Sequence, residues 1–345
     1  MTDKELNELL NRINFLENEN KSLRQWQSEA NNLMSQMLRI IEDSRDKINS
    51  VDRFSKINRY RIDSLPYEMS APDYCLDFVY PKMMSVTETR KKLVNEKMSI
   101  ARLGDGEFSA IVGMKRWNFQ DASLELGEKL KEVLLKEQSN LLVGLNPNFY
   151  RALFDIEESD ADGVRAYMRP MVRKLHADYI SKDRLYADAL FHNISSDTDV
   201  AELKEIWNGR DCLFVEGQYT RMGVGNDLFD NARSIQRVLA PSENAFDKYD
   251  EILKAVLNQN KDKLCLIALG PTATVLAYAL AKEGYQAIDI GHLDLIYEKY
   301  SRGLSSLYEV KIPYKYCNSD EIGDKRIIED LADPEYKQQI ICDLS

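Results

Sequence analysis

From about residue 86 onwards, short apolar segments alternate with helix-like segments, and this alternation constrains the fold more than any other feature. The apolar segments lack a regular change between apolar and polar residues, which is typical of strands buried on both faces. Strands separated by helices predict an α/β, Rossmann-like fold with a mostly parallel sheet covered by helices. The expected strands are residues 98–102, 140–145, 212–216, 237–240, 264–269 and 287–290, with helices over 123–137 and 246–257.

The first fifty residues have a different pattern. From Leu6 and Leu9 to Val51, mainly apolar residues recur at spacings of three and four, and no glycine or proline interrupts them. With Leu6 at a and Leu9 at d of a heptad, Asn20 falls at an a position, where a buried amide fixes the register of a parallel pair. We therefore expect residues 1–51 to form a coiled coil that holds a parallel homodimer. A single helix folded back onto the globular part is the alternative.

The remaining boundaries follow from composition. A chain of 345 residues is long enough for one large domain with an appendage. Prolines punctuate residues 52–85, which predicts a linker packed on the main domain. The main domain is then expected over residues 86–310. The tail, 311–345, is expected to add one helix over 325–331.

Charge and cysteine content exclude several classes of protein. The net charge of −11 argues against a nucleic-acid binder, which needs a broad basic face. The five cysteines are odd in number and lack CxxC spacing, and the start of the chain has no apolar leader, so we expect reduced thiols and a cytoplasmic protein. The most apolar stretch, residues 264–281, is broken by Gly270 and Pro271, so no membrane span is predicted.

In an open parallel sheet, ligands bind beyond the carboxyl ends of the strands. The first expected strand runs into a glycine-rich turn with two acids, Asp105 and Glu107. In an extended turn these side chains would point to the same side and approach one ion, while Gly106 lets a ligand come close. Carboxylates without nearby histidine or cysteine suit Mg²⁺ or Mn²⁺, completed by water and phosphate oxygens. On spacing alone, an ordinary solvated turn is the commoner explanation.

A second candidate loop, residues 216–227, starts with Glu216 and lies between a strand and an expected helix that Asn226 or Asp227 would cap. Its glycines permit close backbone approach, and Arg221 offers a fixed charge to a phosphate. A long loop, however, needs glycines in any case.

Two further loops follow the last two expected strands. Gly270 and Pro271 open an apolar helix, and Thr272 offers its hydroxyl to a phosphate or caps the helix. His292 and Asp294 follow the next strand, although a lone histidine is more often structural than catalytic. Taken together, the four loops indicate a nucleotide-diphosphate site in which a metal stabilises the charge of the leaving group.

The segments RLGDGEF, GVGNDLFD, GPTAT and DIGHLD occur in that order from residue 102 to residue 294. In these segments the chain resembles the GT-D type glycosyltransferase domain, formerly a domain of unknown function of bacterial surface-glycan and adhesin-glycosylation systems. The similarity covers roughly residues 86–300. The resemblance implies metal-dependent transfer of a sugar, typically glucose from UDP-glucose, to a glycan on a protein or lipid carrier. It also implies that the D-x-E triplet, here Asp105 and Glu107, binds the metal.

We therefore expect a glycosyltransferase that uses Mn²⁺ or Mg²⁺. Asp294, Glu216 and His292 are the candidates for a base that takes the proton of the acceptor hydroxyl. A catalytically inactive scaffold that binds partner enzymes is an alternative, and so is a nucleotidyl- or phosphotransferase, although the chain has no lysine-bearing P-loop. The candidate donor-binding residues are Arg102, Gly104, Gly106, Arg221, Gly223, Gly225, Asn226, Gly270, Pro271 and Thr272.

Overall fold

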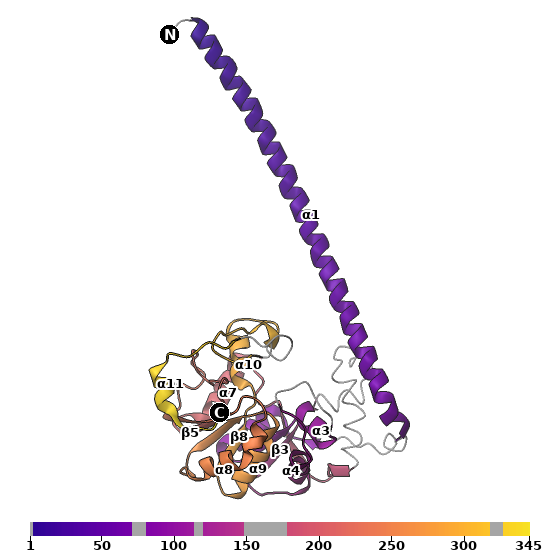
Figure 1. Cartoon of the computed structure of the whole chain (residues 1–345), viewed down its shortest axis with the longest axis vertical. Coiled ribbons are helices and arrows are strands. Elements are labelled where there is room, and N and C mark those ends of the chain that lie inside the picture. The colour runs from indigo at the N-terminus through magenta and orange to yellow at the C-terminus, as the bar shows by residue number, and fades with distance from the viewer. Residues whose placement is uncertain (1–2, 71–80, 114–119, 148–177, 318–326) are drawn as a thin grey trace. The chain divides into compact units, whose positions relative to one another are not determined.

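The computed structural model describes residues 3–70, 81–113, 120–147, 178–317 and 327–345 of the chain (Figure 1). The chain divides into two compact units, residues 1–63 and 64–345. None of the described helices combines the length and the apolar character that a membrane span requires.

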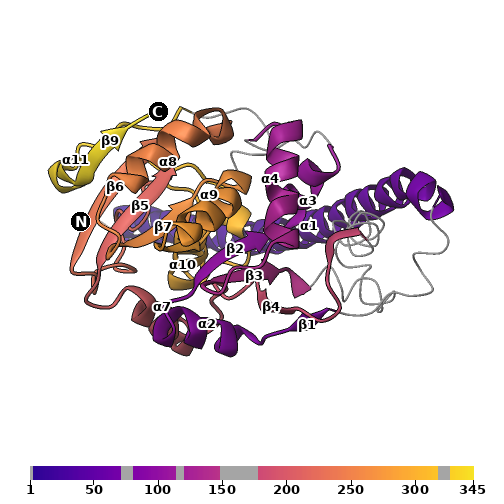
Figure 2. The same cartoon turned by 90° about the horizontal axis from the view of Figure 1, so that it is seen from below.

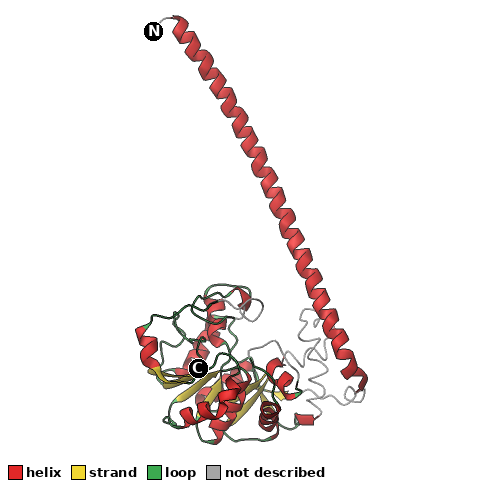
Figure 3. Cartoon of the chain, viewed as in Figure 1, coloured by secondary structure: helices red, strands yellow, loops and turns green. Residues whose placement is uncertain are grey.

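Helix α1, Asp3–Ser70, forms the N-terminal unit and continues past residue 63, and it is drawn as one continuous helix in Figure 3. The expected start of a linker at residue 52 is therefore wrong, because residues 52–70 are helical in spite of Pro66. The physical reason is visible in the sequence, where the three-and-four spacing continues through Ile62 and Leu65. Residues 71–80 of the expected linker lie outside the described residues.

The unit of residues 64–345 is built on a nine-stranded sheet of parallel strands (Figure 2), which confirms the predicted α/β fold. All six predicted strands are present, with ends shifted by at most three residues. The order across the sheet is β1-β4-β3-β2-β8-β7-β5-β6-β9. The strands are β1 (Lys82–Met83), β2 (Ser99–Leu103), β3 (Leu141–Leu145), β4 (Leu185–Asp188), β5 (Asp211–Gly217), β6 (Ser234–Ala240), β7 (Leu264–Ala268), β8 (Gln286–Asp289) and β9 (Ile340–Asp343).

Helices cover both faces of this sheet, so successive strand residues enter different cores. In β2, Ala101 and Leu103 join one core, whereas Ile100 between them joins the other. The first core receives residues of α3 (Asp105–Ile111), α4 (Leu124–Leu135), α8 (Tyr249–Leu257) and α9 (Pro271–Lys282). The second core receives residues of α2 (Val86–Asn95), α7 (Asp197–Trp207) and α10 (Leu293–Ser301). The described residues also include the short 3₁₀ helices η3 (Ala245–Lys248) and η4 (Leu307–Glu309).

The tail differs from its prediction. The expected helix over 325–331 is wrong for residues 327–331, which are not helical, while 325 and 326 lie outside the described residues. Helix α11 (Pro334–Gln339) follows instead, because Asp333 accepts hydrogen bonds from the first backbone N–H groups and Pro334 suits the first turn. The chain then adds β9 to the edge of the sheet beside β6.

A buried arginine fixes this tail. The Arg237 guanidinium lies 4.8 Å from the ring centre of Tyr336 and 4.9 Å from that of Phe214, and it pairs with the buried carboxylate of Glu216. Tyr336 is itself only 6% exposed. The tail is therefore part of the core, and it covers a charge that would otherwise face solvent.

We expect Tyr336→Ala to lower the free energy of unfolding by about 3 kcal/mol, because it leaves a cavity and removes the cover of Arg237. The matched control is Ile327→Ala in the same tail, where the side chain is 92% exposed and truncation should change stability by about 0.5 kcal/mol or less. Urea unfolding measures both variants. Equal stabilities would show that the tail does not contribute to the fold.

Candidate functional site

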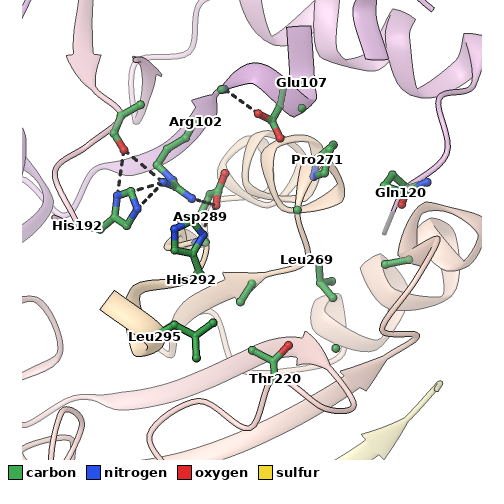
Figure 4. A pocket seen from close by; sticks show the side chains of 18 of the residues that line it. Arg102, Glu107, Gln120, His192, Thr220, Leu269, Pro271, Asp289, His292 and Leu295 are labelled. Atoms are coloured by element: carbon green, nitrogen blue, oxygen red, sulfur yellow. Dashed lines mark hydrogen bonds and ion pairs between the residues drawn. The ribbon is translucent and has the colours of Figure 1, made fainter. Parts of the chain in front are cut away.

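A cavity of about 480 Å³ opens at the carboxyl ends of the strands (Figure 4). Its lining comes from the ends of β2, β5, β7 and β8 and from segments that follow β3, β4 and β6. This edge of the sheet is where ligands of open parallel sheets bind. Nine of the predicted site residues line the cavity: Arg102, Gly104, Asp105, Gly106, Glu107, Gly270, Pro271, His292 and Asp294.

The two acids of the D-x-E triplet open a helix. The expected extended turn is wrong, because Asp105 is the first residue of α3 and Glu107 lies in its first turn. Glu107 folds back, and its Oε2 accepts a hydrogen bond of 2.7 Å from the Gly104 backbone N–H. A Cβ at position 104 would lie 3.2 Å from that oxygen, so glycine leaves the space for the returning carboxylate. Asp105 and Glu107 both reach the cavity in spite of the helical backbone.

Negative charge gathers around Glu107. Burial, together with the nearby carboxylates of Asp289 and Asp105, raises the pKa of its carboxyl to about 7, although the hydrogen bond from Gly104 N opposes the shift. Among the described residues, no group of three or more His, Cys, Asp and Glu side chains is arranged to hold a metal ion by itself. One or two carboxylates completed by phosphate oxygens and water are nevertheless a common way of binding Mg²⁺. The carboxylates of Asp105 and Glu107 at the cavity therefore fit a hard divalent cation that arrives with a phosphorylated ligand.

Arg102, at the end of β2, is held from several sides (Figure 4). Its Nη2 donates to Asp289 Oδ1 at 3.0 Å, and its Nη1 lies 3.3 Å from the Ala189 carbonyl oxygen. The positive φ of 52° at Gly291 suits glycine, and a Cβ there would collide with Nη2 of Arg102. The guanidinium is thus fixed beside the cavity.

Two histidines flank this guanidinium. His192 Nδ1 lies 3.1 Å from the Ala189 carbonyl oxygen and can donate to it, which leaves Nε2 to accept from Arg102 Nη1 at 3.2 Å. Burial, the Arg102 charge and His292 together hold the pKa of His192 well below its usual range. Restricted hydration and Arg102 lower the pKa of His292 to about 4, although Asp105 opposes this. Both imidazoles are therefore neutral at neutral pH.

Asp294 lines the cavity, but its carboxylate is fully engaged. Oδ1 accepts hydrogen bonds from Gly223 N at 2.9 Å and from Asn226 Nδ2 at 2.8 Å, and Oδ2 lies 2.6 Å from Lys315 Nζ. Lys315 is completely buried, and Glu298 lies 3.9 Å from the same Nζ. Asp294 therefore ties the loop after β5, helix α10 and the tail together.

Two of the predicted site residues, Glu216 and Arg221, do not line the cavity and are held by partners within the protein. Glu216 is completely buried, where it pairs with Arg237 and accepts a hydrogen bond from Met222 N at 2.8 Å, so it is excluded as a base for a ligand in the cavity. Burial raises the pKa of its carboxyl even though Arg237 opposes the shift. Arg221 does not line the cavity, because its Nη1 donates to the carbonyls of Tyr314 and Glu329 in the tail. Its expected phosphate contact is therefore not supported.

The loop after β5 also departs from expectation. No helix follows it, and residues 218–233 form successive turns that lead to β6. Asn226 therefore caps no helix and bonds to Asp294 and Glu298, while a Cβ at Gly225 would collide with the Tyr314 hydroxyl. Thr272 is buried and its hydroxyl donates to Gln120 Oε1 at 3.3 Å. The loop residues Gly223, Gly225 and Asn226, together with Thr272, support the site but do not line it.

Sequence reasoning did not select three residues that shape the site: Asp289, His192 and Gln120. Asp289 is the last residue of β8 and lies within the expected strand 287–290, so its position near the strand end was the signal that could have revealed it. His192 follows β4, a strand of four residues that the sequence pattern did not reveal. Gln120 is linked by its side chain to Phe246 N and Thr272, which are distant in sequence, so only the fold brings it to the cavity.

Comparisons with known proteins all match this chain to glycosyltransferases. Residues 100–320 match the family model described as glycosyltransferase GT-D fold. Over 273 residues the chain is 34% identical to a probable glycosyl transferase, Gly, of Streptococcus gordonii, and this match covers 76% of the chain. Over 283 residues it is 32% identical to the glycosyltransferase GlyD of Streptococcus pneumoniae serotype 4, with 77% of the chain covered. The matches span 39% and 33% of those two longer proteins.

Solved structures agree with this match. A structure described as a new glycosyltransferase from Streptococcus sanguinis aligns with a TM-score of 0.66 at 30% identity, covering 77% of this chain and all of that one. A second, described as a domain of unknown function with a distinct glycosyltransferase fold, aligns with a TM-score of 0.68 at 29% identity and covers 85% of this chain and all of its own.

We expect Lys315→Met to destabilise the protein by about 3–5 kcal/mol, because it leaves the buried carboxylate of Asp294 without its cation and leaves Glu298 with Arg302 alone. Adding Asp294→Asn and Glu298→Gln to the same chain should recover much of this loss, since no buried negative charge then lacks a partner. Thermal and urea unfolding test both variants. A triple variant no more stable than Lys315→Met would show that shape, and not charge, explains the effect.

Proposed function

Because this chain belongs to the family of glycosyltransferases with the GT-D fold, we propose that it transfers a sugar from a nucleotide-sugar donor to a glycan acceptor. UDP-glucose is the donor that we propose first, and the acceptor is a glycan on a protein or lipid carrier. We also propose that the enzyme works as a homodimer held by α1.

One observation carries the proposal for the donor. Asp105 and Glu107 at the start of α3 and Gly270 and Pro271 at the start of α9 line the same cavity. A helix start offers unpaired backbone N–H groups to an anion, whereas the carboxylates attract a cation. A metal-bound diphosphate needs both kinds of group side by side.

Asp105 and Glu107 would hold the Mn²⁺ or Mg²⁺ ion, which would neutralise negative charge on the leaving diphosphate. Arg102 lines the same cavity and carries a further positive charge for that group. Its present partners, Asp289 and His192, keep the guanidinium in place before a donor arrives.

In the transfer, the acceptor hydroxyl oxygen bonds to the anomeric carbon as the bond from that carbon to the diphosphate oxygen breaks. The nucleoside diphosphate leaves with the electron pair, and a base takes the hydroxyl proton if the anomeric centre is inverted. Glu216 is excluded by burial, and both oxygens of Asp294 are engaged. We therefore assign the proton to His292, whose exposed side chain lines the cavity.

We expect Asp105→Asn to abolish Mn²⁺-dependent hydrolysis of UDP-glucose and to weaken Mn²⁺ binding in a calorimetric titration with UDP, because the amide carries no charge. The matched control is Asp250→Asn, an exposed carboxylate on α8 that does not line the cavity. Thermal melting checks that both variants fold. Wild-type turnover by Asp105→Asn, or full activity in EDTA, would disprove the metal proposal.

The same assay separates the other functions. A panel of nucleotide sugars and nucleoside triphosphates is offered to the wild-type chain with Mn²⁺. Hydrolysis of triphosphates alone would indicate a nucleotidyl- or phosphotransferase. Binding of UDP-sugars without any hydrolysis or transfer would indicate an inactive scaffold.

A second prediction concerns Arg102. Gly291→Ala should reduce UDP-glucose hydrolysis at least tenfold, a barrier increase of about 1.4 kcal/mol, because the new methyl group displaces the guanidinium. Gly303→Ala is the matched control, since Gly303 also has a positive φ, of 64°, but a Cβ there meets no atom within 4 Å. Both variants should lose about 1 kcal/mol of stability from backbone strain. If both variants keep wild-type activity, the position of Arg102 does not matter for the reaction.

A further inference from the structure

Helix α1 presents a long apolar stripe to solvent. The a and d positions of its heptads include Ile13, Leu16, Leu23, Met34, Met37, Ile41 and Ile48, and these side chains are between 46% and 68% exposed. An isolated helix draws little stability from its own hydrogen bonds, and an apolar stripe of this length in water marks an interaction surface. The narrow a/d spacing fits a partner helix of the same kind.

The residues beside the stripe indicate how a second copy would lie. In a parallel pair, each g residue meets the e residue five positions later in the partner helix. Arg12 at g would then meet Glu17 of the second copy at e, and Glu19 at g would meet Arg24 of the second copy at e. Symmetry repeats each attractive pair on the other side of the coil.

The apolar seam widens further along the helix. Leu33 at g and Leu38 at e are 63% and 56% exposed, and the same spacing of five residues would pack them across the interface. Because both flanking positions are apolar here, this part of the pair would bury more surface than an a/d seam alone.

The charges also select one register. Sliding one helix by a heptad would place Arg12 opposite Arg24 of the second copy on one side of the coil. The same slip would place Glu19 opposite Glu17 of the second copy on the other side. Like charges at these positions repel, so a slip loses all four attractive pairs and gains two repulsive ones.

Polar residues within the stripe favour the same register. Asn20 and Gln27 both occupy a positions, and a parallel pair in register places each beside its own copy. Paired amides can satisfy each other's hydrogen bonds, whereas an amide opposite Ile13 or Met34 would be buried without a partner.

We propose that α1 pairs with α1 of a second copy of this chain as a parallel, in-register, two-stranded coiled coil, with Arg12 to Glu17 and Glu19 to Arg24 as its register-setting ion pairs. This inference rests on the proposed homodimer, but it concerns only the helix surface and not sugar transfer.

Cysteine cross-linking in the full chain tests orientation and register. Leu16→Cys and, in a separate protein, Met37→Cys should each give a disulfide-linked dimer under mild oxidation, because identical d positions face each other in this pair. Asn18→Cys and Arg39→Cys, at the outward f positions of the same heptads, are the matched controls and should remain uncross-linked. The 21 residues between positions 16 and 37 span about 31 Å of helix, so an antiparallel pair can bring at most one of the two sites together. Cross-linking at only one site, or at neither, would overturn the proposal.

Charge reversal tests the ion pairs. Glu17→Arg should weaken the dimer about tenfold in sedimentation equilibrium, a change of about 1.4 kcal/mol, because Arg12 then faces an arginine on both sides of the coil. Adding Arg12→Glu to the same chain should restore the wild-type dissociation constant. Equal weakening by the double variant would overturn the pairing, and a wild-type mass of one, three or four chains would overturn the two-stranded coil. These readouts use no donor sugar, so they hold even if the proposed enzymatic activity fails.

Discussion

The burial of the parallel sheet on both faces is the constraint on which the rest of this structure depends. Strand residues alternate between two apolar cores, as Ile100 and Ala101 do in β2, so little room remains within the strands for groups that must meet a ligand. Polar side chains therefore collect where the strands end. Arg102, Asp289 and Gly217 lie at the carboxyl ends of three different strands, and all of them line one cavity. The position of the candidate site follows from the architecture of the sheet.

Charges that do enter the interior are held by specific partners. Glu216 has Arg237, Asp294 has Lys315, and Asp289 has Arg102. A buried ion pair adds little net stability, but removing one member is costly, and this makes such pairs sensitive to the arrangement around them. Two of these pairs depend on the tail, since Tyr336 covers Arg237 and Lys315 reaches Asp294. The tail, residues 311–345, thus supports the wall of the cavity.

Much of the fold was predictable because it depends on local patterns. Dense apolar runs marked six of the strands, and their alternation with helices predicted the parallel arrangement. Strands β1, β4 and β9 were not predicted; they have two to four residues each, and β1 and β4 stand at one edge of the sheet and β9 at the other. Helix α1 extends beyond its predicted end because the three-and-four spacing of its apolar residues continues. Pro66 was expected to lie in a linker but does not interrupt the helix. In the tail, the apolar spacing predicted the wrong position for the helix. The capping residue Asp333 and Pro334 at the first helical position mark where the helix begins.

By itself, the sequence determined the class of fold, the family resemblance and the approach of Asp105 and Glu107 to the ligand-binding edge of the sheet, because strand periodicity and motif order are local properties. Only the tertiary structure decided which candidates work together. Glu216 and Arg221 do not line the cavity, because Glu216 pairs with Arg237 and Arg221 donates to the Tyr314 carbonyl, and both partners come from distant segments. His192 and Asp289 do line the cavity, where both contact Arg102 from segments that are distant in the sequence. The role of a charged side chain depends on its neighbours in space, and a sequence pattern names only its neighbours along the chain.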